Sequence, residues 1–207
     1  MRVVVGWTRR TVLAVTGWGG RWRDAILLGL LTIGAYGVPL YTLGVLLTPI
    51  RDAEGWSLGL LGAAYSAGLL VAGGLAPLIG RALDRTEPRN ILAPGLVVGS
   101  VLIVAASYAE AQPLFLATWA LGAGVVGGSM QYNVTMPVTA RLYPAERRPA
   151  AYSMLTLVGA FSSPIFFPLA GWLAEEWGWR TALRALTVLM IVCCLPAILV
   201  VRRRFDV

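Results

Sequence analysis

The sequence predicts an all-α, polytopic membrane protein, and three observations support this prediction. Hydrophobic residues make up 57% of the 207-residue chain and charged residues only 13%, whereas a soluble domain carries about 25% charged residues. Long apolar runs alternate with short segments that contain arginine. None of these runs shows the sustained alternation of apolar and polar residues that a membrane β-barrel requires. Because lipid accommodates this much apolar surface and water does not, we expect a bundle of membrane-spanning helices.

The expected elements follow one another in a simple order. A basic arm of residues 1–23 comes first, and its apolar stretch at residues 12–15 is too short for the hydrophobic region of a signal peptide. A six-span membrane bundle then covers residues 24–204, because each apolar run can cross about 30 Å of hydrocarbon at about 1.5 Å per residue. A tail of residues 205–207 ends the chain. The expected spans are residues 25–48, 57–79, 91–109, 114–138, 150–174 and 181–201.

All 17 basic residues are arginines, and their positions predict the orientation of the bundle. The net charge of +7 does not indicate a nucleic-acid partner, because the arginines lie between apolar segments and not along one soluble face. Fourteen of them fall in the arm, the tail region and the segments 80–89 and 141–148, whereas Arg51, Arg180 and Arg184 belong to the other side. Since arginine-rich loops face the cytoplasm, we predict that the arm and the tail are both cytoplasmic.

The chain offers little material for catalysis or metal binding. It contains no histidine, no Gly-x-Ser-x-Gly motif and no pair of carboxylates within a span, so we expect no enzyme. Its two cysteines, Cys193 and Cys194, are adjacent within an apolar run and are typical of small apolar residues in a helix. We therefore expect no metal, no disulfide framework and no cofactor.

Small residues form stripes along two of the expected spans. Close packing of such residues is how helices associate in lipid, and two interpretations stay open: packing among the six spans, or a surface that faces another bundle. The stripe on the second span lies within about 40° on a helical wheel of 100° per residue. The stripes consist of Gly59, Gly62, Ser66, Gly73, Pro77 and Gly80 on the second span, and of Thr156, Gly159, Ser163 and Ala170 on the fifth.

Polar side chains occur in the first and fourth spans. Tyr41 lies on a glycine-rich face of the first span, and Gln131 lies on a similar face of the fourth. A glutamine at mid-membrane depth is costly unless it is paired or faces water, so it indicates either an interhelical hydrogen bond or a cavity. On an uninterrupted helix Asn133 lies on the far side from Gln131. The absence of a central Asp or Glu in any span leaves no candidate here for a buried carboxylate proton relay.

The segment between the second and third spans, residues 80–89, carries a motif. Gly80, Asp84, Arg85 and Arg89 match the pattern Gly-x-x-x-Asp-Arg-x-Gly-Arg-Arg/Lys, and Glu87 stands where the pattern has glycine. This segment resembles the loop between the second and third spans of the major facilitator superfamily, and residues 84–89 are most similar to its monocarboxylate-porter-like members. Residues 142–151 and 159–180 resemble later segments of that family, so that the resemblance covers about residues 25–204.

The resemblance implies roles for particular residues. Gly80 would allow close approach of helices, Asp84 would hold a cytoplasmic gate against a partner half, and Arg85 and Arg89 would complete the charge network of the gate. The substrate cavity would come from the first and fourth spans, with Tyr36, Tyr41, Gln131 and Asn133 as candidates. Helix packing would use Gly59, Gly62, Ser66, Gly73, Gly159 and Ser163. Many members carry an arginine early in the fourth span, where this chain has Thr118 and Trp119.

The family fold has twelve spans in two six-span halves with the substrate between them, and this chain corresponds to the N-terminal half. The resemblance therefore implies a secondary active transporter that moves a small solute, such as an organic anion, by alternating access. Its partners would be the lipid bilayer, the small-molecule substrate and a second six-helix half, in the same longer chain, in a homodimer or on a separate chain. Its location would be the bacterial cytoplasmic membrane. The alternative is a non-transporting six-helix membrane subunit, or a truncated fragment without independent activity.

Overall fold

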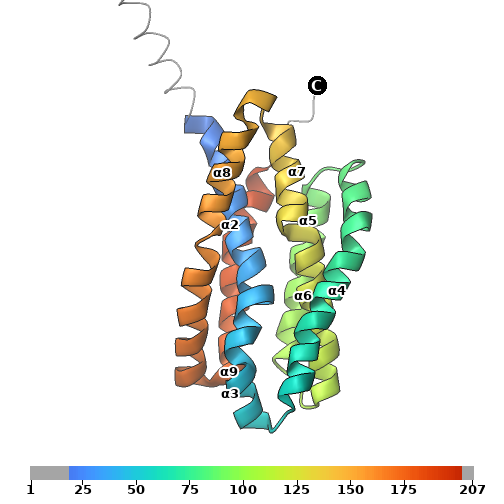
Figure 1. Ribbon diagram of the computed structural model, residues 1–207, viewed down its shortest axis with the longest axis vertical. Coiled ribbons are helices and arrows are strands. Elements are labelled where there is room, and N and C mark those ends of the chain that lie inside the picture. The colour runs from blue at the N-terminus through green and yellow to red at the C-terminus, as the bar shows by residue number, and fades with distance from the viewer. Residues whose placement is uncertain (1–18, 202–207) are drawn as a thin grey trace, which may run out of the picture.

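The computed structural model describes residues 19–201. Most of the expected arm and the whole of the expected tail lie outside the described residues. Within residues 19–201 every regular element is a helix, and most helices run along the long axis of a bundle (Figure 1). Five helical segments are long and apolar enough to cross a membrane. The predicted all-α, polytopic membrane class is confirmed.

The first predicted span is helical throughout but changes its geometry halfway. It consists of α2 (Gly19–Tyr36), the π-helical segment η1 (Gly37–Thr42) and α3 (Leu43–Glu54). Gly55, with a φ of 69°, ends α3 in the left-handed conformation that glycine adopts readily. The chain then reverses into α4 (Leu58–Leu83), which is followed by α5 (Arg89–Ala106).

The fourth predicted span is divided into two helices. These are α6 (Gln112–Met130) and α7 (Tyr132–Leu142), with Gln131 between them. The short 3₁₀ helix η2 (Ala145–Arg147) leads into α8 (Arg148–Gly159) and then α9 (Ser162–Val200).

The count of five membrane-length segments, where the sequence predicts six, has its origin in the last segment, Ala145–Val200. This segment contains the last two predicted spans: the fifth is shared between α8 and the first arm of α9, and the sixth lies in the second arm of α9. Inside α9 only Gly178 (φ 76°, ψ 159°) departs from helical geometry. Phe166 lies against Gly37, and Met190 lies against Gly34, one turn away on the first span. Since these two residues lie twelve positions before and twelve after Gly178, the chain reverses there and the two arms of α9 are antiparallel (Figure 1).

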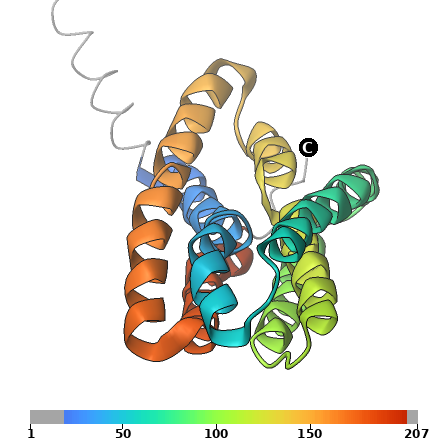
Figure 2. The same ribbon diagram turned by 60° about the horizontal axis from the view of Figure 1, so that its bottom comes forward.

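The helices pack in two groups, which Figure 2 shows from one end of the bundle. One group contains α4, α5 and α6, and the other contains α2, α8 and α9. Helix α4 packs closely on α6, because Gly124 and Gly128 of α6 leave room for Val71 and Leu75 of α4. Small residues thus bring the helix axes together, as expected for helices in lipid.

The connections between helices lie at the two ends of the bundle. The α4–α5 turn, the α7–α8 connection and both ends of the described chain lie at the upper end in Figure 1. The α3–α4 and α5–α6 connections and the reversal at Gly178 lie at the lower end. The segments for which the arginine count predicts a common side, residues 80–89 and 141–148, therefore do lie at one end of the molecule.

A candidate solute-binding groove

The first span departs from α-helical geometry because of Pro39. Proline has no backbone N–H, so the carbonyl of Ala35, four residues earlier, lacks its α-helical donor. The chain widens here into the π-helical segment Gly37–Thr42, where the hydroxyl of Thr42 donates to the carbonyl of Gly37 at 3.0 Å. The amide nitrogen of Gln131 donates to the carbonyl of Ala35 at 3.1 Å. A side chain of the fourth span therefore satisfies a carbonyl that the first span leaves without its usual partner.

The fourth span is interrupted at the residue that makes this contact. Gln131 has an extended backbone (φ −83°, ψ −166°), which ends α6 and starts α7 in a new direction. The carbonyl of Gly128 at the end of α6 accepts a hydrogen bond of 2.6 Å from the side-chain amide of Asn133. Both interruptions are thus held together by side-chain amides, and they lie next to each other in the bundle.

A groove of about 290 Å³ opens beside the two interruptions. It contains three of the four cavity residues that the sequence suggests, namely Tyr36, Gln131 and Asn133, and α4 forms its opposite wall. The expectation that Asn133 lies on the far side of the helix from Gln131 is wrong, because the extended backbone at Gln131 turns α7 relative to α6. The groove is lined by Tyr36, Leu69, Ala72, Gly73, Ala76, Gly127, Gln131 and Asn133.

Tyr41, the fourth suggested cavity residue, lies in a neighbouring groove of about 320 Å³. Its ring packs against Phe167 with ring centroids 5.1 Å apart. Leu40 and Tyr65 of this second groove also line a narrow gap that reaches Gln131. Tyr36 instead packs against Tyr132, with ring centroids 5.0 Å apart and an angle of 46° between the planes. The first span therefore contributes one tyrosine to each groove.

The small-residue stripe of the second span faces open space beside these grooves. Gly59, Ser66 and Gly73 are exposed, and Gly62 is half-buried. A Cβ atom added to Gly62 or Gly73 would meet no heavy atom of the described residues within 4 Å. Gly62 lines one groove and Gly73 the other.

The stripe of the fifth span lies differently. Gly159 is buried, and a Cβ atom at this position would lie 2.9 Å from the side chains of both Thr32 and Tyr132. Ser163 is half-buried. Gly159 therefore allows α8 to pack closely against other helices of this chain, and it does not lie on a surface open to a partner.

The motif residues lie at the upper end of the bundle. Asp84 pairs with Arg141 at the end of α7, at 2.6 Å, and the same guanidinium donates to the carbonyl of Leu83, also at 2.6 Å. Asp84 remains largely exposed, with 73% of its side chain accessible. Arg85 is exposed and Arg89 half-buried.

Gly80 lies on the open side of α4, where an added Cβ atom would meet nothing within 4 Å. Sequence reasoning assigned Arg141 only to topology, because its position next to Asp84 depends on how two distant helices meet.

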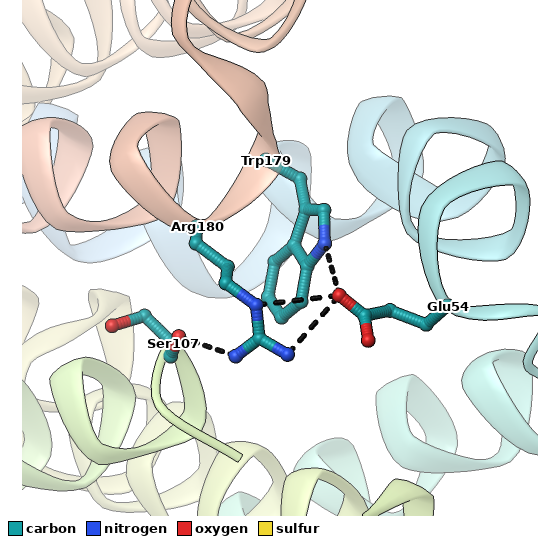
Figure 3. A network of polar contacts seen from close by, with 4 residues as sticks. All are labelled: Glu54, Ser107, Trp179 and Arg180. Carbon is teal, nitrogen blue, oxygen red and sulfur yellow. Dashed lines mark hydrogen bonds and ion pairs between the residues drawn. The ribbon is translucent and has the colours of Figure 1, made fainter. Parts of the chain in front are cut away.

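A second polar network joins helices at the lower end (Figure 3). One carboxylate oxygen of Glu54 accepts hydrogen bonds from the indole of Trp179 at 3.1 Å and from Arg180 at 3.1 and 3.3 Å. Arg180 also donates to the carbonyl of Ser107 at 2.9 Å, and its guanidinium lies over the Trp179 ring, 4.5 Å from the centroid. The network therefore joins the end of α3, the residue that follows α5 and the second arm of α9. Its members are far apart in the chain, and the only signal in the sequence was opposite charges at the ends of two spans.

Comparison with known proteins agrees with this architecture. The family model described as Major Facilitator Superfamily matches residues 12–206. Over 148 residues the chain is 27% identical to a purine ribonucleoside efflux pump, NepI, of Shigella sonnei (strain Ss046), covering 72% of this chain and 37% of the pump. It is 32% identical over 104 residues to the 4-hydroxybenzoate transporter PcaK of Acinetobacter baylyi (strain ATCC 33305 / BD413 / ADP1), covering 49% of this chain and 22% of the transporter.

The matched part thus spans well under half the length of these relatives. The family match, by contrast, extends over nearly all of the chain, and both relatives are named as transport proteins. The chain belongs to the Major Facilitator Superfamily.

Proposed function

We propose that this chain forms the N-terminal six-span half of a secondary active transporter that moves a small solute by alternating access. The observation that carries the proposal is the pair of interrupted spans, at Gly37–Thr42 and at Gln131, beside one groove. Interrupted helices are costly in lipid unless their free backbone groups are satisfied within the protein or by water. Transporters place such interruptions at their substrate sites, and π-helical segments are frequent at functional sites.

The proposed arrangement includes a second six-span half that covers the grooved face. In the apolar stretch of α4, only 17% of the residues are buried within the described part of the chain. The corresponding share is 61% for the span that contains α6 and α7. Helix α4 therefore has one side packed on this chain and another available for the second half. Each arm of α9 crosses the bilayer separately in this arrangement, and both termini lie in the cytoplasm of a bacterium. Asp84 belongs to the gate at that end.

The names of the relatives support a small solute without selecting one. One relative is named as a pump for purine ribonucleosides and another as a transporter for 4-hydroxybenzoate. The first kind of molecule is uncharged at neutral pH, and the second is an organic anion of the kind that the motif resemblance suggests. Both are small enough for a cavity that two grooved halves enclose.

Cysteine accessibility tests alternating access without knowledge of the solute. In the full-length gene product, with Cys193 and Cys194 replaced by alanine, Gly73→Cys places a thiol in the groove. The protein is reconstituted in vesicles, and a membrane-impermeant maleimide is supplied to either face. We expect labelling from both faces and not from one alone, because the groove opens to each side in turn.

A matched control uses Val101→Cys on α5. Val101 is 62% exposed and lies on a helix that contributes no residue to the groove, so we expect it to face lipid and to resist labelling. Labelling of Gly73→Cys from only one face would contradict alternating access and favour the alternative, a non-transporting six-helix subunit or a fragment without independent activity.

A further inference from the structure

We propose that the groove of this half selects an uncharged, planar solute that carries N–H or O–H donors. This inference rests on the proposed function, since it names the class of molecule that the groove recognises. It depends on three features of the groove: the absence of charge, the direction of two side-chain amides, and the position of an aromatic pair.

Among the described residues, the charged side chains lie toward the two ends of the bundle and not at the groove. None of the groove-lining residues is charged, and the sequence has no charged residue between 55 and 80 or between 111 and 140. The ion pairs described above lie at opposite ends, with Asp84 and Arg141 at the upper and Glu54 and Arg180 at the lower. An ion that leaves water for the groove would lose its hydration and meet no countercharge from this half, at a cost of about several kcal/mol.

Each of the two amides in the groove donates one hydrogen bond to the protein through its nitrogen atom. The nitrogen of Gln131 donates to Ala35 at 3.1 Å, and the nitrogen of Asn133 donates to Gly128 at 2.6 Å. The backbone thereby fixes the orientation of each amide and leaves its carbonyl oxygen as the free end. Within residues 19–201 neither of these oxygens accepts a hydrogen bond from the protein. Because a carbonyl oxygen is an acceptor only, a solute that meets these two oxygens must supply the donors, and an anion without donors would be repelled by them.

The remaining walls of the groove suit a flat, apolar face. Tyr36 lines the groove, and its ring packs against the ring of Tyr132. The opposite wall is α4, where Ala72, Gly73 and Ala76 present short side chains. Aromatic rings prefer offset or edge contacts with other rings. A ring of the solute can therefore lie between Tyr36 and α4, with its donors directed at the two amide oxygens.

Four probes of similar size separate charge from hydrogen-bonding capacity. Benzamide is uncharged and carries two N–H donors, benzoate is an anion, benzylammonium is a cation, and N,N-dimethylbenzamide is uncharged without N–H donors. Binding of each to the full-length gene product in nanodiscs is measured by saturation-transfer NMR, with empty nanodiscs as the background. We expect benzamide to bind about tenfold more tightly than each of the other three, since a hydrogen bond or an uncompensated charge is worth about 1 kcal/mol or more.

Two substitutions locate the recognition. Gln131→Leu removes one acceptor, and we expect benzamide affinity to fall toward that of N,N-dimethylbenzamide. The control Gln112→Leu makes the same change at the lower end of α6, where the amide donates to the carbonyl of Ser57 at 3.1 Å, and should leave affinity unchanged. The comparison of the four probes on the unaltered protein needs no variant, so misfolding of Gln131→Leu would leave the test intact.

Each outcome bears on the proposal. Benzoate or benzylammonium binding as tightly as benzamide, or no detectable binding of benzamide, would overturn the selection of an uncharged donor. Equal binding of benzamide and N,N-dimethylbenzamide would overturn the role of the amide oxygens. Failure of the transport proposal is distinguishable, because it shows as one-sided labelling of Gly73→Cys, whatever the preference among the probes.

Discussion

The side-chain amide of Gln131 donates a hydrogen bond to the carbonyl of Ala35, the carbonyl that Pro39 deprives of its α-helical donor. Two irregularities in different spans thus compensate each other. A proline in one helix and an extended residue in another would each leave unsatisfied backbone groups in the membrane if they occurred alone. Placed side by side, they form the wall of a groove.

Gln131→Leu should lower the free energy of unfolding by about 1–3 kcal/mol, the range for leaving a buried acceptor unsatisfied. Pro39→Ala restores an N–H four residues after Ala35, so the cost of Gln131→Leu should shrink in the Pro39→Ala background. Thermal unfolding of the four proteins of this double-mutant cycle in detergent measures the coupling. Strictly additive effects would show that the two sites are independent.

Gly178→Ala should destabilise the protein by about 1–3 kcal/mol, because a φ of 76° with a ψ of 159° is a conformation that essentially only glycine adopts. The cost would come from the backbone alone, since no heavy atom lies within 4 Å of an added Cβ. Gly171→Ala, in a helical part of α9 where the nearest atom lies at 3.9 Å, should be neutral or slightly stabilising. Equal melting temperatures for the two variants would contradict the assignment of the reversal to Gly178.

Glu54→Gln should destabilise the lower end of the bundle by about 1–3 kcal/mol, because the acceptor of Trp179 and Arg180 loses its charge and the half-buried Arg180 is left without a countercharge. The side chains of Glu54 and Arg180 are only 22% and 30% exposed. Asp52→Asn is the matched control: Asp52 pairs with Arg51 at 2.7 Å, but both are largely exposed, so its loss should cost less than about 1 kcal/mol. Chemical denaturation of both variants checks the contrast.

Gly62→Leu should leave the stability of this bundle within about 0.5 kcal/mol of the unaltered protein, because the position faces open space. Transport by the full-length protein should fall, because the added side chain lies on the face proposed to meet the second half. Gly124→Leu should instead destabilise the bundle, since Val71 already occupies that space. Normal transport by Gly62→Leu would remove the glycine stripe from the proposed interface.

Asp84→Asn should change stability by less than about 1 kcal/mol, because its pair with Arg141 is exposed. Transport in reconstituted vesicles should drop severalfold if Asp84 acts in the gate. Asp52→Asn again serves as the control, with an exposed carboxylate at the opposite end. Full activity of Asp84→Asn would show that its pairing with Arg141 is dispensable for the gate.

The sequence predicted the class of fold well and the shape of the site poorly. Each apolar run is long enough to cross the bilayer, so the residue types alone are sufficient to locate the spans. The fifth and sixth predicted spans belong to one helical segment because residues 175–180 are helical except at Gly178, although composition suggested a loop. The π-helical segment at Pro39 and the break at Gln131 lie inside apolar runs, where a helical wheel assumes that the helix continues.

The wheel therefore placed Asn133 on the wrong side, whereas the structure places Tyr36 and Gln131 in one groove and Tyr41 in its neighbour. Pro39 was the signal that could have located the first interruption, since it removes an internal hydrogen bond from the middle of a span. The partners of Glu54 could not be predicted, because Trp179 and Arg180 are 125 and 126 residues away in the chain. Contacts over such separations are decided by helix packing and not by local pattern.

The two sides of α4 differ in how they resist movement. On the side of α6, Val71 and Leu75 fit into the space left by Gly124 and Gly128. A shift of α4 along α6 would therefore bring these side chains into steric clash. On the open side, a Cβ atom added at Gly62 or Gly73 would meet no heavy atom of the described residues within 4 Å, so nothing in this bundle interlocks with α4 there. A helix that rests on this side could change its position along α4 while the contact between α4 and α6 stayed unchanged.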